Sequence, residues 1–342
     1  MATCFNDLSL NQDAIREVLQ NMGLITPQDP LQVTPLTGGV SSTILKISTG
    51  ERQFCLKQAL PTLKVAKAWH APLERVFAEI DWMNTVADIA PQAVAHIQGV
   101  DRSVLCFVMD YLPAGKYENW KNRLLAGDID VDFAARMGDV LGTIHQQTAN
   151  NTALEKQFAY DDNFFSLRLD PYLGETARAH PRHADRILAI LNRTQTTHRA
   201  LVHGDISPKN ILCGPDGPVI LDAECACYGD PAFDLAFCLN HFLLKTVIAP
   251  NIAQQTHLLA AFEALYRAYL RRVDWEATSA VEMRVATLLP CLLLARVDGK
   301  SPVEYLNDQH AAFVRRAGCT LLEQAFIHLH AIQAFWRKEI GL

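Results

Sequence analysis

Residues 201–224 read LVHGDISPKNILCGPDGPVILDAE, a strand-like island between two long helical regions. Two short apolar runs, 211–213 and 219–221, flank the sequence Gly-Pro-Asp-Gly at 214–217. Because Gly, Pro and Asp each favour turn conformations, the island predicts a tight β-hairpin. In that hairpin Cys213 pairs near Pro218. Asn210 then falls beside Asp222 at the open end.

The open end of this hairpin gathers oxygen atoms that suit a metal ion. Asp205 lies five residues before Asn210, across a loop that Pro208 stiffens. Because side chains alternate along a strand, Glu224 is expected on the same face as Asp222. Carboxylate and amide oxygens are ligands that Mg²⁺ takes together with phosphate oxygens and water. The island therefore predicts a magnesium site.

Towards the N-terminus the pattern is that of strands with one good helix. Apolar flanks around the Gly-Gly-x-Ser-Ser tip at 38–42 predict a hairpin, and residues 51–59 alternate between two faces. A six-residue apolar run at 104–109 predicts a buried strand that ends in a Pro- and Gly-containing connector at 110–115. The apolar residues after Leu73 recur at helical spacing, as Val76, Phe77, Ile80, Met83 and Val86.

The connector divides the chain into two expected units, residues 1–111 and residues 112–342. The second unit has a helical pattern on both sides of the 201–224 island. A strand-rich first unit followed by a mostly helical second unit predicts an α+β fold.

Composition excludes several classes of protein. The 342 residues are 49% hydrophobic, which is enough for a sizeable core and excludes a mainly disordered chain. The net charge of −6 is shared equally between the two units, so neither has the basic surface of a nucleic-acid or anionic-membrane binder. The nine cysteines are odd in number and lack metal-site spacing, and residues 1–10 do not resemble a signal peptide. We therefore expect reduced thiols and a cytoplasmic location.

The motifs of the island resemble those of a family, the superfamily of aminoglycoside phosphotransferases and choline kinases. His-Gly-Asp at 203–205 followed by Asn210 is similar to its catalytic loop, and Asp-Ala-Glu at 222–224 to its metal-binding segment. Gly-Asp-Pro at 229–231 with Asp234 is similar to the motif that usually follows. The resemblance implies a bilobal protein-kinase-like fold. Its N-terminal lobe is an antiparallel sheet with one main helix, and its larger C-terminal lobe is mostly helical.

The resemblance also implies roles in ATP- and Mg-dependent phosphoryl transfer. Asp205 accepts the proton of the acceptor hydroxyl. Asn210 and Asp222 hold Mg²⁺, with Glu224 as an additional or indirect ligand. The residues implied in ATP binding are Ser41 and Ser42 of the phosphate loop, Lys57 with its partner Glu79, and Met109, Asp110 and Leu112 of the hinge.

A physical argument independent of the resemblance joins Lys57 to Glu79. Glu79 lies on the apolar stripe of its predicted helix, where an unpaired carboxylate is costly. Lys57 is its natural partner because it lies on the opposite strand face from Phe54 and Leu56. One alternative is that Lys57 is a solvated lysine on its strand. The other is that Glu79 is an ordinary surface residue and that Glu74 is the partner of the lysine.

Other polar residues in the island and just after it have expected supporting roles. His203 is expected to bond backbone groups around the loop, and Asp230 to cap the helix that follows. Asp234 is expected to brace the catalytic loop, and Lys209 to bring a positive charge towards the γ-phosphate. The alternative for Asp205 is a carboxylate that only caps a turn.

The acceptor is expected to be a small molecule. Only eleven residues separate Asp222 from Asp234, which leaves no room for a regulated activation segment. Candidate acceptor contacts are Arg296, Asp298 and Lys300, although the same residues also fit an ordinary helix C-terminus.

The sequence thus predicts a kinase that moves the γ-phosphate of ATP to a hydroxyl of a small metabolite, such as a sugar or an amino alcohol. The alternatives are an aminoglycoside-modifying resistance kinase and a non-catalytic nucleotide-binding module.

Overall fold

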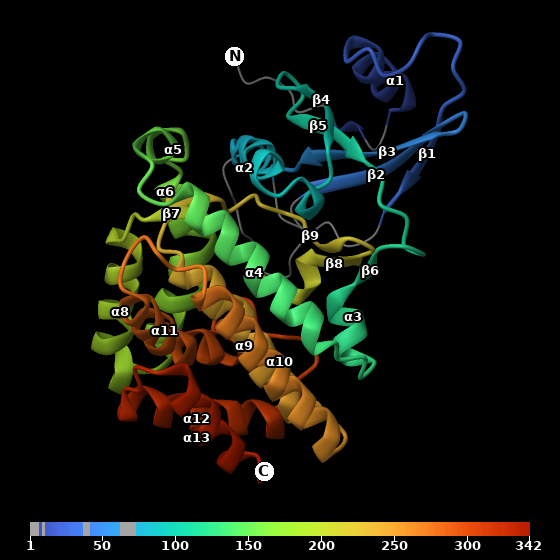
Figure 1. Cartoon of the computed structure of the whole chain (residues 1–342). Coiled ribbons are helices and arrows are strands. Elements are labelled where there is room, and N and C mark those ends of the chain that lie inside the picture. The colour runs from blue at the N-terminus through green and yellow to red at the C-terminus, as the bar shows by residue number, and fades with distance from the viewer. Residues whose placement is uncertain (1–6, 9–10, 37–41, 62–72) are drawn as a thin grey trace.

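The computed structural model of the chain describes residues 7–8, 11–36, 42–61 and 73–342. Its first third is a sheet with a helix on each face (Figure 1). The five strands are antiparallel and run in the order β1-β2-β3-β5-β4. The elements are α1 (Gln12–Asn21), β1 (Gln32–Pro35), β2 (Ser42–Thr49), β3 (Arg52–Ala59), α2 (Arg75–Ile89), η2 (Pro91–Ala93), β4 (Ile97–Asp101) and β5 (Cys106–Asp110).

Alternation along the strands gives the sheet two different faces. Phe54 and Leu56 of β3 pack with α1 in a small core, as the alternation of residues 51–59 predicts. Phe107 of β5 points the other way and joins the main core, to which α2 contributes. Lys57 lies on that second face and is only 4% exposed. The sheet therefore presents the buried side chain of Lys57 on the face that α2 covers.

The rest of the chain is mostly helical (Figure 1). Up to the island its elements are β6 (Glu118–Asn119), α3 (Trp120–Leu125), α4 (Val131–Thr148), α5 (Thr152–Gln157), α6 (Asp161–Phe164), the π-helical η3 (Phe165–Gly174), α7 (Glu175–Ala179), η4 (Pro181–His183) and α8 (Ala184–Thr196). From the island on they are β7 (Ala200–Val202), η5 (Pro208–Asn210), β8 (Ile211–Gly214), β9 (Gly217–Ile220), β10 (Cys227–Gly229), α9 (Ala232–Ile248), α10 (Ile252–Leu270), α11 (Thr278–Asp298), α12 (Asp308–Gln324) and α13 (Leu329–Glu339).

Helices α4 and α10 cross closely because glycine lies at their contact. A Cβ at Gly138 would lie 2.1 Å from the carbonyl oxygen of Leu265, a distance that no larger residue tolerates. Helix α10 also packs against α9, whose residues from Ala232 to Thr246 are all buried. This core fixes the helices on which the island rests.

The island forms two small antiparallel sheets. Strands β8 and β9 form the predicted hairpin, to which β6 adds a third strand, and β7 pairs with β10. Figure 1 shows β8 and β9 between the five-stranded sheet and the helices of the second unit. The hairpin therefore brings its open end to the place where the two parts of the chain meet.

The α+β fold and its antiparallel N-terminal sheet are confirmed. The unit boundary at residue 111 stays a prediction, although the chain does leave the sheet at Asp110 and next enters β6 beside the hairpin. No helix in the described part of the chain is both long enough and apolar enough to cross a bilayer.

Candidate active site

The hairpin β8–β9 has the register that the sequence predicts. Cys213 pairs with Pro218, and the N–H of Leu221 donates to the carbonyl oxygen of Asn210 at 2.9 Å. Asn210 therefore lies beside the segment that leads to Asp222, as expected. Local turn chemistry is enough to bring these residues together.

The alternation of the strand does not continue to Glu224. Strand β9 ends at Ile220, and Asp222 has φ of 70°, in the left-handed region. The expectation that Glu224 shares a strand face with Asp222 is therefore wrong. Its carboxylate lies 3.0 Å from Nε of Arg75, a buried residue of α2.

Asp234 braces the loop at 203–205 through the backbone. Its Oδ2 accepts from the N–H of His203 at 2.7 Å, and its Oδ1 accepts from the N–H of Gly204 at 2.8 Å. Gly204 has φ of 79°, and a Cβ there would lie 2.7 Å from the carbonyl oxygen of Cys225. The loop thus needs glycine for its conformation and for its close approach to the next segment.

His203 bonds backbone groups, as predicted. Its Nδ1 accepts from the N–H of Asp205 at 3.1 Å, which leaves Nε2 to donate to the carbonyl oxygen of Leu221 at 3.2 Å. Burial lowers the pKa of His203, and this favours the neutral ring that these two bonds require. The imidazole thus links the loop at 203–205 to the end of the hairpin by hydrogen bonds.

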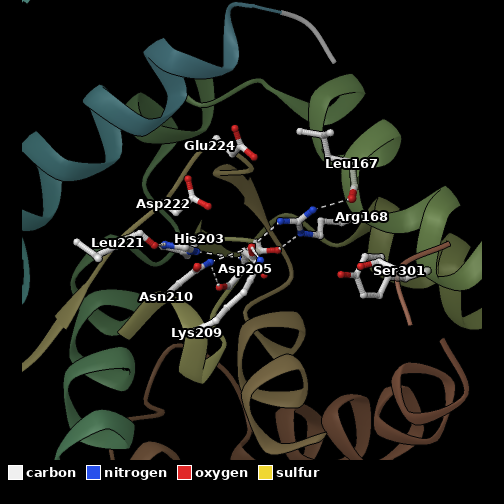
Figure 2. Close-up of polar contacts among 12 residues, drawn as sticks. Leu167, Arg168, His203, Asp205, Lys209, Asn210, Leu221, Asp222, Glu224 and Ser301 are labelled. Carbon is white, nitrogen blue, oxygen red and sulfur yellow. Dashed lines mark hydrogen bonds and ion pairs between the residues drawn. The ribbon is translucent and has the colours of Figure 1, made fainter. Parts of the chain in front are cut away.

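Asp205 is 2% exposed and uses its two oxygens differently (Figure 2). Oδ2 lies 2.8 Å from a guanidinium nitrogen of Arg168 and 3.1 Å from Nζ of Lys209, and it accepts from Nδ2 of Asn210 at 2.8 Å. Oδ1 is buried and has no partner among the described residues. One oxygen is therefore saturated, and the other is left to accept a hydrogen bond.

The charges around Asp205 keep it ionised. Burial alone would raise the pKa of this carboxyl, but Arg168 and Lys209 outweigh that effect and lower it. Asp205 is therefore a carboxylate at neutral pH. Such a group can accept and orient a hydroxyl donor, but it is a weak base.

Lys57 bridges two carboxylates in the cleft. Its Nζ lies 2.7 Å from Oε1 of Glu79 on α2, so the predicted pair is present, and 2.5 Å from Oδ1 of Asp222. Burial disfavours the charged ammonium, but the two carboxylates outweigh it and raise the pKa of Lys57. The same ammonium lowers the pKa of Asp222 against the effect of burial. Lys57 and Asp222 are thus held in their charged forms, whereas burial outweighs the ammonium at Glu79 and raises the pKa of that carboxyl to about 7.

Asn210 and Asp222 have the donor chemistry that magnesium requires. The amide nitrogen of Asn210 is occupied by Asp205, to which it donates twice, so its Oδ1 is the atom left for a ligand. Asp222 supplies a carboxylate that is 30% exposed and lines the same cavity. Hard oxygen donors of this kind suit Mg²⁺.

A cavity of about 340 Å³ lies between the sheet and the hairpin. Its apolar wall includes Leu36, Ile44 and Leu221. Ser41 lies outside the described residues. The sequence-predicted site residues that line the cavity are Ser42, Lys57, Glu79, Met109, Asp110, Leu112, Asn210 and Asp222.

The three candidate acceptor contacts lie at the end of α11 and just beyond it. Arg296 donates to the hydroxyl of Tyr172 at 3.0 Å and to the carbonyl oxygen of Ser301 at 2.7 Å. Asp298 is bound by Arg315 and His180. The backbone N–H of Lys300 donates to the carbonyl oxygen of Pro171. None of the three lines the cavity beside Lys57 in the described structure, and their role in acceptor binding stays a prediction.

Two arginines of the site are missing from the sequence prediction. Arg168 lies in the π-helical η3, 37 residues before Asp205 (205 − 168), and Arg75 lies at the start of α2. The sequence feature that could have pointed to Arg168 is a single cation in the otherwise mostly apolar run Phe-Phe-Ser-Leu-Arg-Leu at 164–169. A charge in such a run requires a buried partner, but the sequence does not identify which one.

The chain matches known proteins over most of its length. Residues 32–275 match the model of the phosphotransferase enzyme family. A methylthioribose kinase of Pectobacterium atrosepticum is 24% identical over 299 residues, which span 78% of this chain and 73% of that protein. One of Enterobacter sp. strain 638 is 25% identical over 265 residues, spanning 68% and 65%.

Solved structures of small-molecule kinases share the fold. An ethanolamine kinase of Plasmodium vivax has a TM-score of 0.58 at 12% identity, covering 92% of this chain and 91% of its own. A choline kinase of Cryptosporidium parvum has a TM-score of 0.54 at 12% identity, covering 93% and 96%. The chain belongs to the phosphotransferase enzyme family and is a small-molecule kinase of the aminoglycoside phosphotransferase and choline kinase superfamily.

Proposed function

We propose that this kinase moves the γ-phosphate of ATP, in a magnesium-dependent reaction, to a hydroxyl group of a small metabolite. The observation that carries the proposal is the asymmetry of Asp205, whose Oδ2 is saturated by cations and an amide while its Oδ1 is buried without a partner. An acceptor hydroxyl donating to Oδ1 would be oriented for in-line attack. Orientation is the main demand of phosphoryl transfer, whose transition state is largely dissociative in most analyses.

The nucleotide occupies the cavity between the two lobes, residues 1–111 and 112–342. Lys57 contacts its α- and β-phosphates, and Glu79 keeps that lysine in place. The adenine bonds backbone groups of Asp110 and Leu112, next to Met109. The apolar lining of the cavity supports a planar base there.

Asn210 and Asp222 hold the magnesium ion, which neutralises charge on the β- and γ-phosphates when it is bound. Glu224 acts on the site indirectly, because its carboxylate is engaged by Arg75. Lys57 contacts Asp222 directly, which supports a site where the lysine binds phosphates next to the metal ligand. When nucleotide binds, magnesium would be the partner of the Asp222 carboxylate and phosphate oxygens would be the partners of the Lys57 ammonium, so both groups of this ion pair keep an opposite charge beside them.

A non-catalytic nucleotide-binding module is the weaker alternative. The positions that phosphoryl transfer requires are filled at Asp205, Asn210, Asp222 and Lys57. Asp234 also braces the loop that carries Asp205, through the N–H groups of the two preceding residues. A module that only bound nucleotide would have no need for a carboxylate with one oxygen left unpaired in a buried position.

Magnesium-dependent release of ADP tests the proposal. The purified chain is incubated with ATP and a panel of sugars, polyols, hydroxy acids and amino alcohols, with EDTA as the metal-free control. We expect turnover with at least one acceptor, its loss in EDTA, and its loss in Asp205→Asn. Turnover that survives Asp205→Asn undiminished would refute the assigned proton acceptor.

A further inference from the structure

One face of α9 leads from the site of phosphoryl transfer to a buried lysine. Phe237, His241 and Lys245 follow one another at intervals of four residues, so they lie along the same side of the helix. The ring of Phe237 packs against Tyr172 of η3, with centroids 5.3 Å apart. The ring of His241 is one turn further on, 6.0 Å from Phe237.

Tyr172 connects this face to Asp205. The guanidinium carbon of Arg168, which binds Asp205, lies 5.9 Å from the centre of the Tyr172 ring. The guanidinium carbon of Arg296 lies 5.7 Å from the same centre, and Arg296 also donates to the Tyr172 hydroxyl. In Figure 2, Ser301, whose carbonyl oxygen Arg296 binds, lies on the same side of Asp205 as Arg168. The cationic groups therefore continue beyond the catalytic loop.

Lys245 is 2% exposed, and among the described residues no carboxylate lies within ion-pair distance of it. Its ammonium lies 5.0 Å from the centre of the Tyr305 ring. Burial, together with the nearby cations Lys121 and Arg296, lowers the pKa of Lys245 to about 7. A bound anion would reverse this effect by pairing with the ammonium.

Several polar atoms beside Lys245 are also without partners. His241 is 6% exposed, and its Nε2 makes no hydrogen bond in the described structure. The same is true of Nε of Arg296 and of the hydroxyl of Tyr305. Native proteins satisfy most buried polar groups, so a cluster of unsatisfied donors marks a place where a ligand supplies acceptors.

The nearby carboxylates do not balance these cations. Glu304 is paired with Lys121, and Asp298 is held by Arg315 and His180. Burial and the cations Lys245, Arg296 and Lys209 hold the pKa of His241 well below its ordinary value. The region beyond Asp205 is therefore electropositive. That charge disfavours polycationic and quaternary-ammonium acceptors.

We propose that the acceptor is a hydroxy acid, held through its carboxylate by Lys245 and Arg296 while its hydroxyl donates to Oδ1 of Asp205. The inference rests on the proposed kinase function and specifies its substrate class. The hydroxyl oxygen forms a bond to the γ-phosphorus as the bond from that phosphorus to the β,γ-bridging oxygen breaks. ADP leaves with the electron pair, and the hydroxyl proton passes to Asp205. Tyr305 and His241 contribute hydrogen bonds to the carboxylate.

Matched pairs of acceptors test this substrate class. Ribonate with ribose, gluconate with glucose, and glycerate with glycerol differ in the presence of the carboxylate, and choline and ethanolamine serve as cationic controls. Each is assayed for ADP release with Mg²⁺ and ATP, and for thermal stabilisation with Mg²⁺ and a non-hydrolysable ATP analogue. We expect kcat/KM at least tenfold higher for an acid than for its neutral partner.

The variant Lys245→Met removes the charge but keeps an unbranched side chain of similar length. Because the charge is buried and unpaired, we expect the variant to fold with an unchanged or higher Tm. It should raise the KM of the preferred acid at least tenfold and leave the KM of ATP within twofold. Lys338→Met, at an exposed lysine of α13, is the matched control and should change neither value.

The outcomes separate this inference from the proposed function. Asp205-dependent turnover of neutral or cationic acceptors in preference to acids would leave the kinase function intact and overturn the hydroxy-acid inference. So would an acid whose KM Lys245→Met does not change, or the lack of any acid-specific stabilisation when the nucleotide analogue does stabilise the protein. Failure of Mg²⁺ and nucleotide to bind at all would overturn the proposed function itself.

Discussion

A guanidinium nitrogen of Arg168 lies 2.8 Å from Oδ2 of Asp205, and Nε of the same arginine donates to the carbonyl oxygen of Gly204 at 2.7 Å. Both side chains are almost fully buried. Together with Lys209 and Asn210, the arginine occupies Oδ2 of Asp205 and leaves Oδ1 available. It also fixes the loop through the carbonyl oxygen of Gly204. We therefore predict that Arg168 positions Asp205 for phosphoryl transfer.

Arg168→Met should destabilise the fold and lower kcat. Removing one partner of a buried ion pair leaves an uncompensated charge, which costs about 3–5 kcal/mol of unfolding free energy. Denaturant unfolding measures this cost, and Arg168→Met with Asp205→Asn should recover part of it. Arg178→Met, at an exposed arginine that also pairs with carboxylates, is the matched control and should cost at most about 1 kcal/mol. Equal losses at both arginines would contradict the assignment.

Asp205 and Asp222 should have separable effects. Asp205→Asn should lower kcat by about 10²–10⁴-fold, the range for a positioned proton acceptor, and should leave magnesium-dependent nucleotide binding intact. Asp222→Asn should abolish that binding, because it removes a carboxylate ligand. Thermal shift with an ATP analogue, with and without EDTA, measures binding, and ADP release measures kcat. If both variants lose the magnesium-dependent shift alike, the division of roles is wrong.

Lys57→Met should weaken both nucleotide binding and the fold. Glu79 is 3% exposed, and without the ammonium its carboxylate is left buried and unpaired, at a cost of about 3–5 kcal/mol. The double variant Lys57→Met with Glu79→Leu should recover stability but not nucleotide binding. Lys46→Met, on the adjacent strand where the ammonium lies over Tyr111, is expected to cost only about 0.5–1 kcal/mol. A double variant no more stable than the single one would show that the pair does not hold the sheet to α2.

Gly204→Ala should lower kcat as well as stability. The new Cβ would meet the carbonyl oxygen of Cys225 at 2.7 Å, so the loop that carries Asp205 must shift. Gly50→Ala is the matched control, because Gly50 also has a positive φ but has open space around it. In that control the free energy of unfolding should fall by only about 1–2 kcal/mol, the cost of a side chain in the left-handed region, and kcat should not change. If both variants keep kcat, the conformation of the loop does not control Asp205.

The amino-acid sequence alone was enough to predict the parts of the site that are brought together by short-range interactions. The Gly-Pro-Asp-Gly turn determines the register of β8 and β9, and this register places Asn210 beside the segment leading to Asp222. The helical stripe of α2 also favoured the pairing of Glu79 with Lys57 over the alternatives, because a buried carboxylate requires a cation, and the structure has this pair. In each case a local period or turn limits the possible neighbours.

Tertiary structure alone decided the contacts whose partners come from distant segments. No spacing rule relates Arg168 to Asp205, and none aligns the face of α9 with Arg296 and Tyr305. The placement of Glu224 was wrongly predicted because strand alternation ends where Asp222 adopts a positive φ. Packing selects among the many cations and helix faces that the sequence offers, since each buried charge must find its partner in three dimensions.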